Sequence, residues 1–224
     1  MNYADLFRAT LPETALEIAA LLVLVVDLAL LRKAALNVRA AGAALLGVAG
    51  CGAALWAMGM QGGAGLSYGG ATLLAAGSYI AVAQIGILIL TALTLLLLID
   101  SAFTRNPGEY VAVVLMAAAG GLIIAAAQDL LVIFVGLELL SLGLYILTAF
   151  AKSSGKSAEA ALKYYLFGGM SAAFLLFGFS YLYGITGSTN LHEILLAVYG
   201  WNAYHAAPLL YVAIVLVLTG LGFK

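Results

Sequence analysis

Long apolar segments alternate with short polar ones along the whole chain. Six segments approach the length of about 20 residues that a helix needs to cross a bilayer; they span 13–31, 40–59, 79–99, 109–127, 129–150 and 158–183. A seventh begins near Ala207 and runs to Lys224. Lipid cannot satisfy exposed backbone groups, so each segment is predicted to be helical. We therefore predict an all-α polytopic transmembrane bundle of six full helices and part of a seventh, which Gly220 and Gly222 mark as a candidate broken helix.

The polar connections differ in character. "QD" at 128–129 indicates a tight hairpin between two antiparallel helices, and the Gly-rich stretch 60–77 lacks a Walker lysine and is expected to be an ordinary loop. The connection at 184–206 is polar at first and amphipathic near Leu191–Tyr199. We expect this part to lie along the membrane surface, with Tyr199, Trp201 and Tyr204 at headgroup level.

Composition supports a membrane protein. Of 224 residues, 65% are hydrophobic and 8% charged, whereas soluble domains carry about a quarter charged residues. A net charge of −1 gives no basic surface for nucleic acid, so no nucleic-acid partner is expected. Cys51 is the single cysteine and excludes an intramolecular disulfide. The N-terminus lacks a basic region followed by a small-residue cleavage site, so the first apolar segment is expected to stay in the protein.

Basic residues are distributed unequally between the two sides. The loops after the first, third and fifth predicted helices share one face and carry Arg32, Lys33, Arg39, Arg105, Lys152 and Lys156. The opposite face carries Arg8. The positive-inside rule places the basic loops in the cytoplasm, or in the matrix of an organelle, and the N-terminus outside.

Glu138 lies near the middle of the fifth predicted helix, in "FVGLELLSLGLYIL". A carboxylate at this depth costs at least about 2.5–3.5 kcal/mol on insertion scales, so it is expected to face the bundle interior. Ser141 and Tyr145 follow at helical spacing and place hydroxyl groups on the same stripe. Glu138 is either a neutral acid bonded to a carbonyl or a proton site controlled by a nearby cation.

Lys163 and Lys224 are the candidate cations. Lys163 lies shortly after the start of the sixth predicted helix, where Ser157 is a plausible N-cap. Glu159 lies four residues before Lys163. Lys163 is therefore either a snorkelling lysine paired with Glu159 or a partner of Glu138 reached directly or through water. Lys224 ends the run "LVLTGLGFK", and spacing alone favours a membrane-border anchor.

The remaining polar residues carry weaker signals. Asp27 lies close to Arg32 and Lys33 and is expected to be their local charge partner, and His192 and Glu193 are expected to be solvated. Metal-ligand spacing, a nucleophile elbow and a dinucleotide fingerprint are absent from the sequence, so no metal, haem or redox site is predicted on this chain.

Several long motifs occur in a recognisable order: "LPETALEIAALLVLVVDL", "AAAQDLLVIFVGLELLSLGLYILTAF", "KSAEAALKYYLFGGMSAAFLLFGFSYLYGITGSTNL" and "LTGLGFK". They closely resemble subunit N of the proton-translocating NADH:quinone oxidoreductase, respiratory complex I, called chain 2 in mitochondria. The likeness is dense over 109–224 and looser over 60–100. It implies an antiporter-like fold, with helices one to three in residues 1–108 and a truncated first repeat in 109–224.

The resemblance also implies roles for individual residues. Glu138, Lys163 and Lys224 match the family's charged positions and would form the input half of a proton channel, with Glu138 paired to Lys163 and coupled to Lys224 on a broken helix. Ser141, Tyr145 and Glu159 would support them. NADH, FMN, iron–sulfur clusters and quinone would belong to other subunits of the complex, with no cofactor on this chain.

The family's chain continues through about as many helices again, so this chain is expected to be a fragment, a split product or one of two partner chains. The implied partners are the other membrane subunits, including sister antiporter-like subunits, and the lipid bilayer. A bacterial inner membrane is expected in preference to the mitochondrial one. Two alternatives stay open: a subunit of a multi-subunit cation/proton antiporter or membrane-bound hydrogenase, and a non-pumping structural membrane piece.

Overall fold

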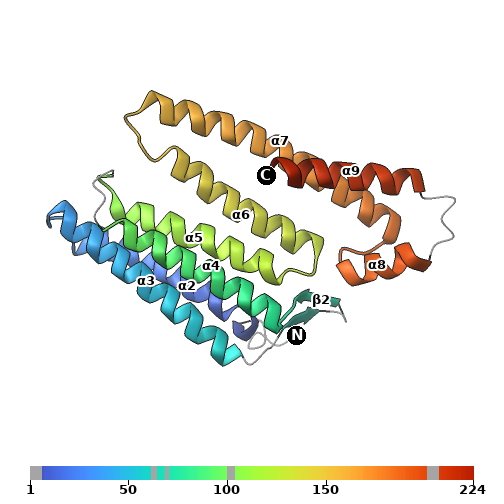
Figure 1. The fold of residues 1–224 in the computed structure, drawn as a ribbon, viewed down its shortest axis with the longest axis horizontal. Helices are drawn as coiled ribbons and strands as arrows, with labels where there is room; N and C mark the ends of the chain where they lie inside the picture. The colour runs from blue at the N-terminus through green and yellow to red at the C-terminus, as the bar shows by residue number, and fades with distance from the viewer. Residues whose placement is uncertain (1–6, 62–64, 69–70, 100–103, 201–206) are drawn as a thin grey trace.

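Helices dominate the fold of the chain. The computed structural model describes residues 7–61, 65–68, 71–99, 104–200 and 207–224 (Figure 1). Its elements are α2 (Leu11–Ala29), α3 (Leu36–Gln61), β1 (Leu66–Tyr68), β2 (Ala71–Leu74), α4 (Ser78–Leu97), α5 (Pro107–Ala126), α6 (Leu130–Thr148), α7 (Gly155–Thr186), α8 (Leu191–Gly200) and α9 (Ala207–Phe223). The predicted helical bundle is confirmed, and every predicted transmembrane segment overlaps one of these helices.

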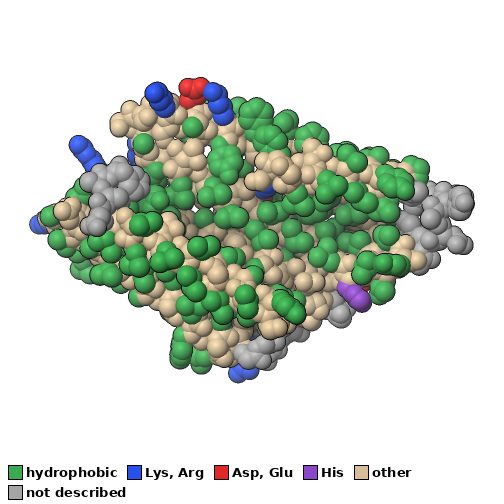
Figure 2. Space-filling view, in the orientation of Figure 1, with side chains coloured by type: hydrophobic (Ala, Val, Ile, Leu, Met, Phe, Trp, Pro, Cys, Tyr) green, Lys and Arg blue, Asp and Glu red, His purple; other side chains and the backbone are tan. Residues whose placement is uncertain are grey.

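Five helices, α3 to α7, are long and apolar enough to cross a membrane. The helix α2 has 19 residues but carries three carboxylates, Glu13, Glu17 and Asp27. The helix α9 is apolar and shorter. Many large apolar side chains face outward, and green apolar surface covers much of the face in Figure 2. A water-soluble protein rarely exposes so much contiguous apolar surface, so the outer surface suits lipid and partner subunits. The chain is an integral membrane protein.

The helix boundaries follow local capping chemistry. Pro12 and Pro107 lie in the first turns of α2 and α5, where a missing N–H costs nothing. The side chain of Asp129 caps α6 by accepting a hydrogen bond from the Leu131 N–H at 2.8 Å. The helix α7 begins three residues earlier than predicted, because Ser154 is its N-cap and accepts from the Ser157 N–H. The expectation that Ser157 caps this helix is therefore wrong.

The helices form two groups that are joined through α6. In the first group α2 packs on α3 and α5, and α4 packs on α3 and α5; their shared core contains Leu16, Val23, Leu88, Leu95 and Leu115. In the second group α7 packs against α9 and α8. The helix α6 contacts α5 on one side and α7 on the other (Figure 1). The tight connection at 128–129 places α5 and α6 side by side, as the sequence predicted.

The Gly-rich stretch at 60–77 contains structure that the sequence did not predict. β1 and β2 pair as an antiparallel hairpin, with Ser67 opposite Thr72. This hairpin is tied to the helical connections: Leu74 bridges Ala127, and the Asn190 side-chain amide donates to the Thr72 carbonyl at 2.7 Å. The expectation of an ordinary loop is wrong here because these backbone groups find partners in segments distant in sequence.

The two ends of the bundle differ in charge. We call "basic end" the end that holds the α2–α3, α4–α5 and α6–α7 connections, and "hairpin end" the end that holds β1, β2 and α8 (Figure 1). The six lysines and arginines predicted to share one face lie in or beside the connections of the basic end. The amphipathic segment forms the short helix α8; Tyr199 is exposed, while Trp201 and Tyr204 lie outside the described residues.

Candidate functional site

A partly buried ion pair joins α6 to the end of α9. The Lys224 ammonium Nζ donates a hydrogen bond to Glu138 Oε1. The Lys224 side chain is 8% exposed and that of Glu138 is 26% exposed, although Glu138 lies near the middle of a membrane-crossing helix. Removing two charges from water is costly, and close pairing recovers part of that cost. Of the two candidate cations, the structure thus pairs Lys224 with the Glu138 carboxylate.

The face of α6 that carries Glu138 is held by close packing on α7. Ser141 and Tyr145 are both buried, as their spacing predicted. The ring of Tyr145 packs edge-on against Tyr164 and Tyr165. Its hydroxyl occupies the space of the missing side chain at Gly168, where a Cβ would lie only 1.9 Å from Tyr145 Oη. Any larger residue at 168 would force the Tyr145 ring to move.

Lys224 is positioned by the contact between α9 and α7. A Cβ added to Gly220 would meet three atoms of Leu175 at 2.9–3.0 Å. The buried Ser171 hydroxyl donates to the Gly220 carbonyl at 2.5 Å. Small residues let two membrane helices approach closely. Gly220 therefore serves packing, and the predicted break is not observed: α9 runs continuously through Gly220 and Gly222 to Phe223.

Lys163 does not pair with Glu138. Its ammonium donates to Glu159 Oε1 at 2.5 Å on the same helix, and both side chains are about two-thirds exposed, at 66% and 64%. The expected Glu138–Lys163 pair is therefore wrong for this structure, and the local pairing that the sequence also allowed is the one observed. Spacing on one helix fixed the Glu159 contact, whereas the partner of Glu138 depended on how α9 docks.

Asp27 also has a different partner from the one expected. Both of its oxygens accept hydrogen bonds from Arg39, at 2.8 and 2.7 Å, rather than from Arg32 or Lys33. Arg39 lies on α3, and it also donates to the Arg105 carbonyl at 3.4 Å. Asp27 is 2% exposed, so this bidentate pair is a buried tie at the basic end.

The other candidates are accounted for in simpler terms. His192 and Glu193 are exposed, as expected, and Glu193 accepts from the Ser188 hydroxyl. Cys51 is a buried free thiol. Within the described parts of the chain, no group of three or more histidine, cysteine or acidic side chains could hold a metal ion.

Glu13 is a buried acid that sequence reasoning missed. Glu13 is buried at 4% exposure beside a cavity that also meets Gln61 and Gln84. From the sequence, Glu13 reads as an ordinary acid in the first turn of a helix, directly after Pro12. Only the helix packing shows that its carboxyl group faces inward.

The fold and the ion pair together define the class: a polytopic helical membrane protein that keeps a carboxylate–ammonium pair away from bulk water. A family model described as "NADH:quinone oxidoreductase/Mrp antiporter, TM" matches residues 127–224. This region contains Glu138, Lys163 and Lys224. Over its whole length, the chain is 47% identical to NADH-quinone oxidoreductase subunit N 2 of Acidobacterium capsulatum. The chain belongs to this family of membrane subunits.

Further comparisons agree with this family and show its architecture. NAD(P)H-quinone oxidoreductase subunit 2 of Prochlorococcus marinus is 38% identical over 97% of this chain. A chain of respiratory complex I from Thermus thermophilus superposes with a TM-score of 0.69 at 28% identity, covering 94% of this chain and 43% of that one. A chain of the membrane-bound sulfane sulfur reductase, an archaeal respiratory membrane complex, shares the fold with a TM-score of 0.72 at 23% identity.

The chain spans less than half the length of these relatives. It covers 46% of the Acidobacterium capsulatum protein and 40% of the Prochlorococcus marinus protein. The shared part includes α2 to α9, and therefore includes both members of the Glu138–Lys224 pair.

Proposed function

We propose that the chain acts in a proton-translocating membrane subunit of an NADH:quinone oxidoreductase and that Glu138 and Lys224 carry its proton chemistry. The observation that supports this proposal most directly is the ion pair itself, which links two different helices inside the membrane region. Ionisable residues inside membrane segments are rare and commonly mark ion or proton pathways.

The geometry suggests how protonation is coupled to helix position. While the pair is closed, the charge on Lys224 stabilises the carboxylate of Glu138, and the carboxylate holds the proton on the Lys224 ammonium. If α9 moves relative to α6, both charges lose their partner in a poorly hydrated region. Loss of a proton by the ammonium and uptake of a proton by the carboxylate would remove these two uncompensated charges. A shift of one helix thus becomes a transfer of protons.

Lys163 is a third member of the proposed pathway. Its side chain is exposed on the outside of the described bundle, where a neighbouring subunit or another segment can contact it. Release from Glu159 would free it to exchange a proton. We propose supporting roles for Ser141 and Tyr145, whose hydroxyl-bearing side chains are buried on the helix that carries Glu138.

Substitution of Glu138 tests the proposal. In membranes that contain the assembled complex, Glu138→Gln should reduce proton translocation per quinone reduced at least about tenfold, because the amide keeps the shape but cannot exchange a proton. Proton uptake is measured with a pH-sensitive dye while quinone reduction is followed separately. Glu109→Gln is the matched control, since Glu109 lies in an exposed pair with Lys152 and should leave translocation unchanged. Normal translocation by an assembled Glu138→Gln complex would overturn the proposal.

A cation/proton antiporter subunit is the second candidate, because the matching family model carries both names. The same ion pair suits either activity. The energy source distinguishes the two activities. In an oxidoreductase subunit, proton movement should start on addition of NADH and quinone. In an antiporter subunit, it should start when a sodium or potassium gradient is applied. In the alternative of a non-pumping structural piece, Glu138→Gln would leave translocation unchanged.

We also propose the setting in which the chain works. The excess of lysine and arginine at the basic end favours a cytoplasmic location for that end in a bacterial inner membrane, with the N-terminus outside. The partners would be the other membrane subunits of the complex. The redox cofactors and the quinone would be bound by subunits other than this one. Protease cleavage of α8 from the outer side of oriented vesicles tests this orientation.

A further inference from the structure

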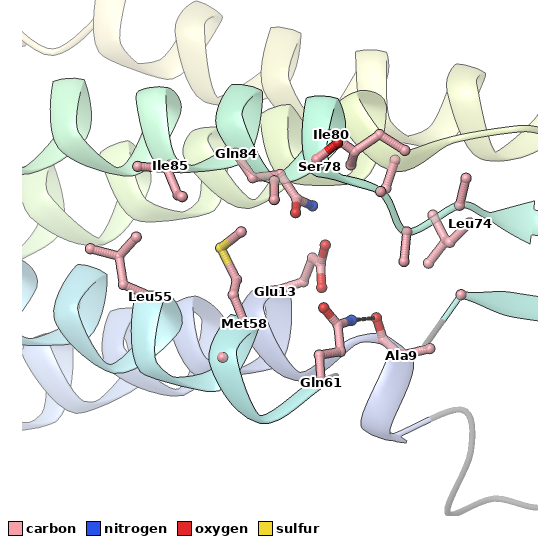
Figure 3. A pocket seen from close by; sticks show the side chains of 17 residues that line it. Ala9, Glu13, Leu55, Met58, Gln61, Leu74, Ser78, Ile80, Gln84 and Ile85 are labelled. Carbon is pink, nitrogen blue, oxygen red and sulfur yellow. Dashed lines mark hydrogen bonds between the residues drawn. The ribbon is translucent and has the colours of Figure 1, made fainter. Parts of the chain in front are cut away.

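A cavity of about 490 Å³ lies at the hairpin end, far along the bundle from the Asp27–Arg39 pair. It is open on one side and is lined by the first turns of α2 and α4, the last turns of α3 and the chain after β2 (Figure 3). The apolar part of its wall includes Leu55, Met58, Ile80 and Ile85. Such a volume has room for several water molecules where polar partners are present.

One carboxyl and two amide side chains supply such partners. Glu13 on α2, Gln61 on α3 and Gln84 on α4 all point into the space between their helices (Figure 3). Gln61 donates its amide hydrogen to the Ala9 carbonyl, and Gln84 donates to the Leu122 carbonyl at 3.2 Å. Each amide nitrogen donates to a backbone carbonyl, and each amide oxygen stays available as an acceptor. Hydrogen-bond acceptors therefore gather around the carboxyl group of Glu13.

Glu13 is the member whose bonding is incomplete. It is 4% exposed, and its Oε2 atom is buried without a hydrogen-bond partner among the described residues. A buried polar atom with no partner costs about 1–3 kcal/mol, so such atoms are normally satisfied by water, an ion or a proton. The unpaired oxygen therefore indicates that the cavity is occupied by something that donates hydrogen bonds.

Charged groups of the described protein do not supply the missing donor. On α2, Glu17 lies one turn away and is exposed, and Arg8 before the helix is exposed as well. The helix α4 and both strands contain no charged residue. Arg39 of α3 and Glu109 of α5 belong to pairs at the basic end.

Asp129 is an acid of another element, at the start of α6. It is already satisfied, because it accepts hydrogen bonds from the Leu131 N–H and from the Thr189 hydroxyl. Glu13 therefore faces neutral walls, and no described cation compensates its charge when it is ionised.

We propose that this cavity is a water-filled proton-binding site in which Glu13 takes up and releases a proton on the hairpin side, with Gln61 and Gln84 as positioning residues. A hydronium ion of the cavity water transfers its proton to the Glu13 carboxylate and leaves a water molecule behind. The resulting O–H group donates to an amide oxygen of Gln61 or Gln84, or to water, and satisfies the unpaired oxygen. This site is separate from the Glu138–Lys224 pair. The proposal therefore does not depend on the proposed function.

Carbodiimide labelling of the wild-type chain in its membrane tests the proposal without turnover. Dicyclohexylcarbodiimide reacts with protonated carboxyl groups in apolar surroundings and leaves a stable acylurea that mass spectrometry locates. Labelling of Glu13 should rise as the pH falls, by up to about tenfold per pH unit, as for one titrating proton. Asp27 is the internal control, because its buried ion pair with Arg39 should keep it unlabelled. Absence of label at every pH, or labelling that does not change with pH, would overturn the proposal.

A water-soluble, impermeant carbodiimide tests the side of access. Glu193 on α8 is exposed at the hairpin end and Glu159 on α7 is exposed towards the basic end, so their labelling reports which end faces the reagent. Labelling of Glu13 should follow that of Glu193; if it follows that of Glu159, the site does not open to the hairpin side.

Two variants test the positioning role. Gln84→Leu removes an amide acceptor and should shift the midpoint of the Glu13 labelling profile, whereas Gln84→Glu at low pH, where it is protonated, keeps an acceptor and should restore the profile in part. Glu17→Gln should leave the label on Glu13, which shows that the modified acid is the buried one. An unchanged midpoint in Gln84→Leu would remove Gln84 from the site.

Discussion

Glu138 and Lys224 lie 86 residues apart in the sequence and form a partly buried ion pair between α6 and the end of α9. These two helices pack mainly on other elements, α6 on α5 and α7 and α9 on α7. The pair is therefore a direct polar connection between two helices that pack mainly on other elements.

The energetic coupling within this pair can be measured directly. Glu138→Gln and Lys224→Met should each lower the free energy of unfolding by about 3–5 kcal/mol, because each leaves an uncompensated charge, and the double variant should lose less than the sum. Unfolding is followed by denaturant titration in detergent. The exposed pair Glu159–Lys163 is the control, with an expected coupling of about 0.2–1 kcal/mol. Additive losses at Glu138 and Lys224 would show that the two charges do not interact.

Gly220 should be needed for the docking of α9. Gly220→Ala places a methyl group 2.9 Å from Leu175 Cβ and its backbone nitrogen, so the helices must separate at a cost of about 1–3 kcal/mol. Gly222→Ala is the matched control because its Cβ meets nothing within 4 Å. Melting temperatures of the two variants provide the comparison. Equal melting temperatures would contradict the close approach of α7 and α9.

The contact of Tyr145 with Gly168 predicts a similar contrast on the other side of α7. Gly168→Ala should destabilise the chain by about 1–3 kcal/mol, because the Tyr145 hydroxyl occupies the position of the new methyl group. Gly169→Ala adds the same methyl group where the structure has open space. Quenching of tyrosine fluorescence around Tyr145 should change in the first variant and stay constant in the second.

The Asp27–Arg39 pair should hold the basic end together. Asp27→Asn leaves the partly buried Arg39 without its bidentate partner and should cost about 3–5 kcal/mol. Lys152→Ala, which opens the exposed pair with Glu109, should cost about 1 kcal/mol or less. Hydrogen exchange at the first turns of α3 and α5 should accelerate in Asp27→Asn and remain unchanged in Lys152→Ala.

Asn190 should link α8 to the hairpin. Its amide donates to the Thr72 carbonyl, and its oxygen accepts from the backbone N–H groups of His192 and Glu193 at the start of α8. Asn190→Ala removes this cap and should cost about 1–2 kcal/mol. Faster hydrogen exchange in both α8 and β2 is the expected result. His192→Ala is the control, because the His192 side chain is exposed and its backbone N–H is retained.

Much of the architecture could be predicted from the sequence because it depends on local properties. Apolar segment length located the membrane helices, and the positions of lysine and arginine separated the two ends of the bundle. The motif around Glu138 identified the family, and the four-residue spacing of Glu159 and Lys163 allowed the pair that the structure contains. Helix starts were less accurate, since Ser154 and Ser157 are both suitable caps and only one position is compatible with the turn after α6.

The sequence by itself determined which segments enter the membrane and which of them carry charges there, because transfer of a segment into lipid depends on its own residues. The tertiary structure decided which charge meets which. Glu138 pairs with Lys224 because Gly220 lets α9 approach α7, Asp27 pairs with Arg39 because α2 and α3 are neighbours, and Glu13 faces a cavity because three helix ends meet there. A contact between distant residues depends on the docking of whole helices, and that docking results from packing across many side chains rather than from any local pattern.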